Sequence, residues 1–309
     1  MSYQETYKKW CTDPYFDAQT QEELKNLEGN EKEIEDCFYR QLEFAREATL
    51  CLNANGIHTY LFESLRPTPE LSFAVRELGC IAGIVITASH NPREYNGYKV
   101  YWEDGAQITP PHDKNILAEV AKVTDFSMVK TMEEDEARAE NLFSIIGTDF
   151  DDKYIAQLKK QSIHPEAAKD MKIVYTPLHG TGNIPVRRVL RELGFTQVYV
   201  VEEQKVPDGN FPTVPYPNPE DKNAWTLALE LAKKVDADII LATDPDADRL
   251  GVHAKDTKTG EYVSFTGNMS GMLIAEYILR ERTKTGTMPE NPALVETLSL
   301  IHISEPTRP

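Results

Sequence analysis

The alternation of helical and strand-like segments between residues 150 and 243 restricts the fold most strongly. The helical patterns cover 150–162, 183–194 and 221–235, and the strand-like runs cover 171–176, 196–202 and 238–243. A connection between parallel strands needs a crossover, which is usually a helix. The pattern therefore predicts a doubly wound layer in which helices cover both faces of a parallel sheet.

The N-terminal half changes from a helical to an alternating pattern. Residues 15–55 are mostly helical, and the strand-like run 59–65 and a helix over 69–78 follow. Gly83–Thr87 (GIVIT) is a continuous apolar run, which is typical of a strand buried on both faces. Strand, helix and strand predict another parallel α/β layer. The hydrophilic stretch 124–142 separates the two halves, and an apolar helix around 268–281 is expected to start a third unit.

Composition excludes several classes of function. The 309 residues carry a formal net charge of −17, which argues against a nucleic-acid partner or an anionic membrane surface. The start has no apolar signal region, and no segment approaches the ~20 apolar residues that span a bilayer. We therefore expect a cytoplasmic enzyme. The four cysteines have no CxxC spacing and are expected to be reduced thiols, namely Cys11, Cys37, Cys51 and Cys80.

A serine follows the buried run 83–87, in the segment Ile86–Pro92 (ITASHNP). Ligands of open parallel sheets bind at such strand ends. The hydroxyl of Ser89 needs a base or a metal to become a good nucleophile, and His90 and Lys99 are nearby groups that can move protons. An Asx-Pro turn with a capping serine is the structural alternative. A serine hydrolase is disfavoured because the Gly-x-Ser-x-Gly elbow is absent.

Three carboxylates follow the run 238–243, at Asp244, Asp246 and Asp248. In an extended segment their alternate spacing places them on one side, which suits a hard cation. A solvated acidic turn is the alternative. An EF-hand is excluded because Arg249 and Lys255 stand where it needs glycine and glutamate. A two-aspartate phosphatase motif is excluded because Asp248 follows Ala247 directly.

These motifs together resemble those of the α-D-phosphohexomutases. TASHNPREYNGYK (87–99) is similar to their phosphoserine loop and DPDADR (244–249) to their magnesium loop. TPLHGTG (176–182) and PDGNFPTVPYPNPE (207–220) follow the same order, and the similarity covers nearly all of residues 45–297. The resemblance implies an α/β fold of consecutive domains with mixed, mostly parallel sheets flanked by helices. The expected divisions are a phosphoserine domain at 1–145, a magnesium-loop domain at 146–256 and the start of a third domain at 257–297.

The resemblance also implies a phosphoglucomutase or phosphomannomutase reaction. Phosphorylated Ser89 would donate its phosphoryl group to a sugar monophosphate, and the resulting bisphosphate would return its other phosphate. Mg²⁺ would be held by Asp244, Asp246, Asp248 and an oxygen on Ser89. A glucose 1,6-bisphosphate-type activator is expected. The substrate would be a hexose phosphate, with a pentose phosphate as the alternative.

The remaining roles rest on the same resemblance. Arg249 would hold the phosphoserine, and His90 and Lys99 would transfer protons to and from the sugar hydroxyls. His179 would contact phosphate or another domain, although a structural histidine is an equal alternative.

Two departures from the family pattern predict an incomplete protein. The segment 35–44 runs directly into 45–53, as if a block containing the family's first strand and its glycine-rich loop were deleted between Phe44 and Ala45. Residues 298–309 are expected to be a non-native tail. The first domain would be truncated, the third only begun, and mutase turnover negligible. Alternatives are a non-catalytic magnesium- or phosphosugar-binding fragment, or a phosphatase that hydrolyses its own phosphoserine.

Overall fold

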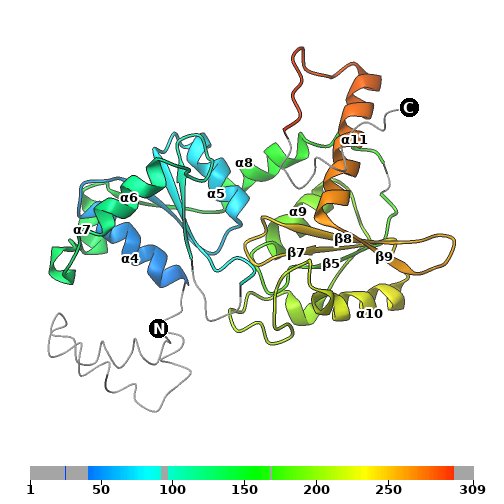
Figure 1. The fold of residues 1–309 in the computed structure, drawn as a ribbon, viewed down its shortest axis with the longest axis horizontal. Coiled ribbons are helices and arrows are strands. Elements are labelled where there is room, and N and C mark those ends of the chain that lie inside the picture. Colours follow the sequence, from blue (N-terminus) through cyan, green and yellow to red (C-terminus); the bar gives the residue numbers. More distant parts are fainter. Residues whose placement is uncertain (1–24, 26–40, 92–96, 168, 296–309) are drawn as a thin grey trace. The chain divides into compact units, whose positions relative to one another are not determined.

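The computed structural model describes residue 25 and residues 41–91, 97–167 and 169–295, and the chain divides into two compact units (Figure 1). The first unit runs to Ala88 and resumes over residues 93–150. The second unit contains Ser89–Pro92 and the residues from Asp151 onward. The segment around Ser89 therefore belongs to a different unit from the strand that precedes it.

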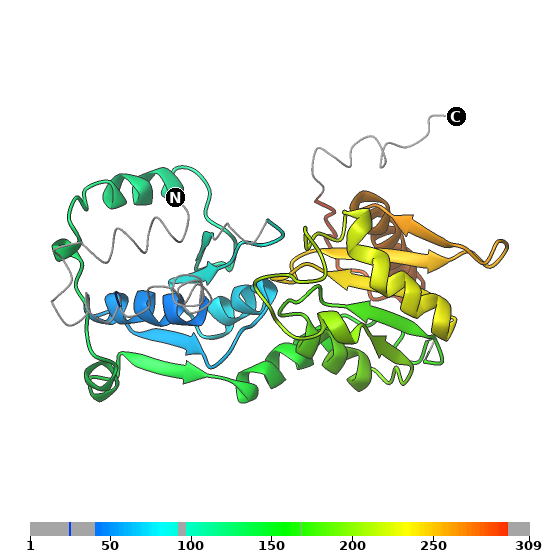
Figure 2. The ribbon, with the colours of Figure 1, turned by 90° about the horizontal axis from the view of Figure 1, so that it is seen from below.

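The first unit contains two separate two-stranded sheets. β1 (Thr59–Phe62) pairs in parallel with β4 (Phe143–Ile146), and the two lie side by side in Figure 2. β2 (Ala82–Ile86) pairs antiparallel with β3 (Tyr98–Trp102). The predicted parallel layer of 59–65 with 83–87 is therefore wrong. β2 is half-buried along its whole length rather than buried on both faces, and its local pattern does not select its partner.

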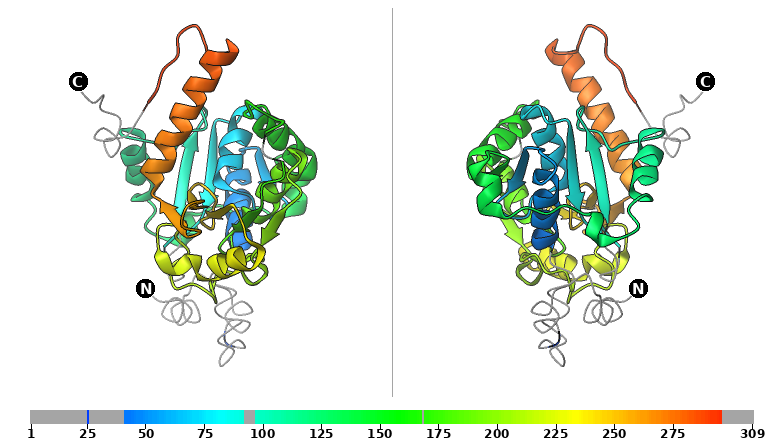
Figure 3. Two further views of the ribbon diagram at one scale, coloured as in Figure 1. Left: turned by 90° about the vertical axis from the view of Figure 1, so that its right-hand side faces the viewer. Right: turned by 90° about the vertical axis from the view of Figure 1, so that its left-hand side faces the viewer.

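Helices support these short sheets in the first unit. α4 lies against β1 and β2 (Figure 3), and it continues through Phe44 and Ala45 without a break. α5 begins directly after Pro67, whose extended backbone and missing N–H suit a helix start. A small core joins Leu50, Ala137 and Phe143. The helices are α4 (Gln41–Asn53), α5 (Thr68–Glu77), α6 (His112–Val120), the 3₁₀ turn η1 (Phe126–Met128) and α7 (Glu134–Ala139).

The second unit is built on one five-stranded sheet with the order β6-β5-β7-β8-β9. The first three strands in this order are parallel, as predicted, and the last two add antiparallel pairs. The strands are β5 (Ile173–Thr176), β6 (Val198–Val200), β7 (Ile239–Thr243), β8 (Leu250–Lys255) and β9 (Tyr262–Phe265). The sheet is thus mixed, and the sequence rhythm predicted only its parallel part.

Helices lie on both faces of this sheet. α10 lies on one side and α9 on the other, while α11 packs on β8 and β9 (Figure 1). The helices are α8 (Thr148–Lys159), α9 (Asn183–Glu192), α10 (Thr226–Val235) and α11 (Gly267–Thr285), with 3₁₀ turns η2 (Glu202–Gln204) and η3 (Lys222–Trp225). The helices predicted at 150–162, 183–194, 221–235 and 268–281 are confirmed within a few residues.

The core of the second unit lies between α10 and the sheet. Ala228 and Ala232 face the strands, and their small side chains let the helix approach closely. Trp225 is only 3% exposed, and its Nε1–H donates to the Pro219 carbonyl at 2.8 Å. A buried indole needs such a partner for its polar atom. The packing holds the end of β7 in a defined position.

The carboxyl ends of β5 and β7 meet at one edge of the sheet. Thr176 of β5 is opposite Ala242 of β7 in the parallel register. The loops that leave these two strands, 177–182 and 244–249, therefore start side by side. This is the edge at which open α/β sheets bind ligands.

Some sequence expectations fall outside the described residues or stay predictions. Cys11, Cys37 and the tail at 298–309 lie outside the described residues, while Cys51 and Cys80 have free thiols.

No described helix combines the length and apolar character required to cross a membrane. Residues 257–295 belong to the second unit together with 151–256, and a third domain starting at residue 257 stays a prediction.

Candidate active site

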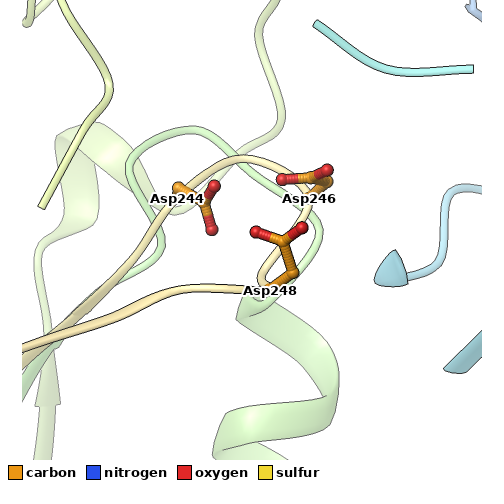
Figure 4. A group of neighbouring side chains, drawn as sticks. All are labelled: Asp244, Asp246 and Asp248. Atoms are coloured by element: carbon orange, nitrogen blue, oxygen red, sulfur yellow. The ribbon is translucent and has the colours of Figure 1, made fainter. Parts of the chain in front are cut away.

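The acidic loop, residues 244–248, connects β7 to β8. Asp244 and Asp246 are 0% and 4% exposed, whereas Asp248 is exposed. Each offers a carboxylate oxygen within 4.8 Å of the others, and Figure 4 shows the side chains around a common point. Ala247 has a φ of 52° and donates its N–H to the Asp244 carbonyl at 3.0 Å, which reverses the chain. Within the described parts of the chain, no other His, Cys, Asp and Glu group of three has this spacing.

Burial and repulsion make this loop unfavourable when its carboxylates are all charged. Burial, followed by the charges of Asp246 and Asp248, raises the pKa of Asp244 to about 8. The backbone N–H of Arg249 donates to Asp244 Oδ1 at 3.0 Å and partly opposes this shift. A divalent cation would favour the charged form and remove the repulsion. An all-oxygen donor set of this kind fits Mg²⁺.

Ser89 is half-buried and its hydroxyl reaches the acidic loop within the second unit. Its Oγ donates to Asp244 Oδ2 at 3.3 Å and lies 3.2 Å from His90 Nδ1. The φ of Ser89 is 53°, a left-handed conformation that non-glycine residues adopt rarely and often at functional sites. The turn directs the hydroxyl toward the carboxylates rather than along the preceding strand.

His90 is kept neutral by its surroundings. Burial lowers its pKa, as does the charge of Arg249, while Asp246, Asp248 and Glu220 act in the opposite direction. A neutral imidazole can accept a proton from a neighbouring hydroxyl. The Ser89 hydroxyl therefore has two candidate proton acceptors within 3.3 Å, the Asp244 carboxylate and the His90 ring, and its one proton can go to only one of them at a time.

Of the other predicted site residues, Arg249 lies in the second unit and Lys99 in the first. Arg249 directly follows the acidic loop and is exposed. Lys99 is on β3, opposite Val85 of β2. The second unit thus brings together six predicted site residues, namely Ser89, His90, Asp244, Asp246, Asp248 and Arg249, and the assignment of Lys99 stays a prediction.

The side chain of His179 is 4% exposed and engaged inside the second unit. Its Nε2 lies 2.9 Å from Thr213 Oγ1, and its Nδ1 lies 3.3 Å from the Val206 carbonyl. Burial lowers its pKa, which agrees with a neutral ring that donates from Nδ1 and accepts at Nε2. These contacts favour the structural alternative for His179 over direct contact with phosphate.

Thr181, which the sequence identified only as part of the segment 176–182 and without a role of its own, contacts the acidic loop directly. Both its N–H and its Oγ1 lie within hydrogen-bonding distance of the Pro245 carbonyl. The available signal was the pair of glycines around it, Gly180 and Gly182, because glycines often mark a close backbone approach.

Family models match both units of the chain. The model described as phosphoglucomutase/phosphomannomutase, alpha/beta/alpha domain I, matches residues 36–126, and that of domain II matches residues 152–258. The chain belongs to the phosphoglucomutase/phosphomannomutase family. Ser89 falls within the matched part of domain I and the acidic loop within that of domain II. The family's named members are isomerases, and its α/β architecture is the one found here.

Individual relatives carry three different mutase names. The chain is 39% identical over 261 residues to a Haemophilus influenzae protein named "Probable phosphomannomutase", covering 82% of this chain and 52% of that protein. It is 40% identical over 263 residues to phosphoglucomutase of Staphylococcus haemolyticus, covering 83% and 46%. It is 40% identical over 238 residues to phosphopentomutase of Homo sapiens, covering 76% and 39%.

A solved structure shares the fold. The phosphoglucomutase/phosphomannomutase family protein of Burkholderia thailandensis matches with a TM-score of 0.56 and 26% identity, over 75% of this chain and 46% of that one. The chain thus spans about half the length of the relatives and structures that it matches.

Proposed function

We propose that this chain carries the phosphoryl-transfer centre of a phosphoglucomutase or phosphomannomutase. The observation that carries the proposal is the position of the Ser89 hydroxyl oxygen, which lies 3.3 Å from a carboxylate oxygen of Asp244 in the acidic group and 3.2 Å from His90 Nδ1. These distances support a centre in which Ser89 is the nucleophile, His90 the base and the three aspartates the cation-binding group, the parts that phosphoryl transfer requires.

Asp244, Asp246 and Asp248 would hold the cation together with an oxygen on Ser89. Bound Mg²⁺ supplies neutralisation of the negative charge on the transferred phosphoryl group. When a sugar bisphosphate returns a phosphate to the enzyme, Ser89 Oγ forms a bond to phosphorus and the sugar oxygen leaves. His90 Nδ1 would take the hydroxyl proton of Ser89 and pass it to the departing sugar oxygen, which becomes a free hydroxyl. Arg249 follows the acidic loop and would hold the phosphate on Ser89 through charge-assisted hydrogen bonds.

The test is a single transfer between glucose 1,6-bisphosphate and the chain in the presence of Mg²⁺. Wild type should gain one phosphoryl group and release a glucose monophosphate. Asp246→Ala should slow the transfer by at least about 100-fold, because one buried ligand of the cation is lost. Asp256→Ala removes an exposed carboxylate that accepts from the Lys258 N–H at 2.8 Å, and it should behave as wild type. Equal transfer rates in Asp246→Ala and wild type would contradict the proposed centre.

Phosphopentomutase is the second candidate, because relatives of that name are as similar as the phosphoglucomutases, at 40% identity. Phosphorylated chain should be offered glucose 6-phosphate, mannose 6-phosphate and ribose 5-phosphate in turn. We expect the hexose phosphates to accept the phosphoryl group faster. Faster transfer to ribose 5-phosphate would favour the pentose assignment.

Repeated turnover should be slow for the 309-residue chain by itself. It spans about half the length of its relatives, and any charge-assisted phosphate contact made by the rest of such a protein would contribute ~1.5–3 kcal/mol, which is roughly ten- to a hundredfold. In a coupled assay from glucose 1-phosphate to glucose 6-phosphate, we expect a rate at least about tenfold below that of a full-length relative. A rate within that tenfold range would show that these 309 residues suffice for the complete reaction.

A further inference from the structure

Thr181 is bonded to the acidic loop at a single backbone atom. Its N–H and its Oγ1–H donate to the carbonyl oxygen of Pro245, at 2.8 and 2.9 Å. A carbonyl oxygen has two lone pairs, so these two donors occupy both. Pro245 lies between Asp244 and Asp246. The two hydrogen bonds therefore act on the Pro245–Asp246 peptide unit, which lies between the two residues that carry the buried carboxylates.

The direction of this carbonyl group determines the position of the Asp246 backbone. The proline ring fixes the φ of Pro245 but leaves its ψ free. Rotation about ψ would turn the peptide plane and change the position of the Asp246 carboxylate relative to Asp244. Two hydrogen bonds to the carbonyl oppose this rotation. We propose that Thr181 is a positioning residue that orients Asp244 and Asp246 for the cation, a proposal that rests on the proposed function of the acidic loop.

The two glycines beside Thr181 allow this close approach. A Cβ at Gly180 would lie 2.3 Å from Pro245 Cα, and one at Gly182 would lie 2.5 Å from Tyr175 Oη and 2.6 Å from Thr243 Oγ1. Gly182 has a φ of −66°, which any residue can adopt. Position 182 therefore requires a glycine because a side chain would not fit there, and not because of its backbone conformation. The segment 180–182 is shaped to place Thr181 against the acidic loop.

The other side of this segment is fixed by polar side chains, of which Thr176, His179 and Gln204 are buried and Thr213 is exposed. Thr176 Oγ1 donates to Gln204 Oε1 at 2.6 Å, and Gln204 Nε2 donates to Thr213 Oγ1 at 2.9 Å. The N–H of His179 donates to the Gln204 carbonyl at 2.9 Å. Buried and mutually bonded groups of this kind hold a single arrangement. These hydrogen bonds hold the segment that carries Thr181 in one position, and His179 takes part in them.

The experiment is a Mg²⁺ titration of the chain and its Thr181 variants by calorimetry. Thr181→Val keeps the branched shape and the main-chain N–H but removes the hydroxyl donor. We expect its dissociation constant for Mg²⁺ to rise about 10- to 100-fold, as for other residues that orient metal ligands. Thr181→Ser restores the donor and should return the constant to within about threefold of wild type. If Thr181→Val does not fold, Thr181→Ala and Thr181→Ser give the same comparison without the branch.

Thr226→Val is the matched control. Thr226 also donates its Oγ1–H to a backbone carbonyl, that of Asn223 at 3.1 Å, but it is exposed at the start of α10. Its affinity for Mg²⁺ should be that of wild type. Wild-type affinity in Thr181→Val, or affinity as weak in Thr181→Ser as in Thr181→Val, would overturn the positioning role alone. Absence of Mg²⁺ binding in wild type, or unchanged binding in Asp246→Ala, would overturn the cation site itself and this proposal with it.

Discussion

Replacing Ser89 by alanine should abolish phosphoryl transfer from glucose 1,6-bisphosphate, with a loss of at least about 10³-fold. The variant removes the oxygen that lies 3.2 Å from His90 Nδ1 and 3.3 Å from Asp244 Oδ2. Peptide mass spectrometry of the tryptic fragment 77–93 should show one phosphoryl group in wild type and none in Ser89→Ala. Alanine tolerates the backbone at this position about as well as serine does, so the fold should be kept.

Ser144→Ala is the matched control for this experiment. Ser144 Oγ also lies close to a histidine nitrogen, 3.0 Å from His58 Nε2, but on β4 of the first unit. It should take up no phosphate in wild type, and its substitution should leave transfer unchanged. Transfer that survives in Ser89→Ala, or that stops in Ser144→Ala, would show that the nucleophile has been misassigned.

Mg²⁺ should stabilise the protein more strongly as the pH rises from 6 to 8. Burial raises the pKa of Asp244 to about 8, so a cation that binds below this pH must displace a proton. The apparent affinity should therefore increase by close to tenfold for each pH unit below about 8. At a Mg²⁺ concentration 100 times the dissociation constant, the free energy of unfolding rises by about 2.7 kcal/mol. Thermal unfolding with and without Mg²⁺ at several pH values measures this difference.

Without Mg²⁺, the contribution of Asp244 to the stability of the protein should fall as the pH rises. Between its unfolded pKa of 3.8 and about 8, Asp244 binds more protons in the folded state than in the unfolded chain. By linkage, its contribution to the free energy of unfolding falls as the pH rises through this range. Asp244→Asn removes the titration, keeps an acceptor for the Arg249 N–H, and should be more stable than wild type at pH 8 without Mg²⁺. An identical pH dependence of stability in both proteins would contradict the raised pKa.

The candidate site could be predicted from sequence where its geometry is local. Asp244, Asp246 and Asp248 lie within five consecutive residues, so their convergence follows from one turn after one strand. The approach of Ser89 to Asp244 depends on residues 155 positions apart. Local pattern alone does not predict such a contact, and resemblance to the family suggested it.

Strand pairing was predictable only for β5, β6 and β7 of the second unit. In the second unit, β5, β6 and β7 are separated by helices, and that rhythm restricts them to parallel neighbours. The pairing of β1 with β4 joins residues 84 positions apart, and no helix-and-strand rhythm specifies it. The role of Thr181 was not predicted for a related reason, because its partner is the carbonyl oxygen of Pro245, and backbone atoms leave no signature in a sequence.

The enclosure of Trp225 gives the second unit an optical signal of its own. The part of the chain that the structure describes contains two tryptophans, and Trp102 is 40% exposed on β3 of the first unit. The indole of Trp225 is enclosed, and its ring centroid lies 4.0 Å from that of His253 on β8, the strand that follows the acidic loop. A chain with both Trp10→Phe and Trp102→Phe keeps Trp225 as its single tryptophan. The wavelength of its emission would therefore report when the sheet that carries the acidic loop loses its packing.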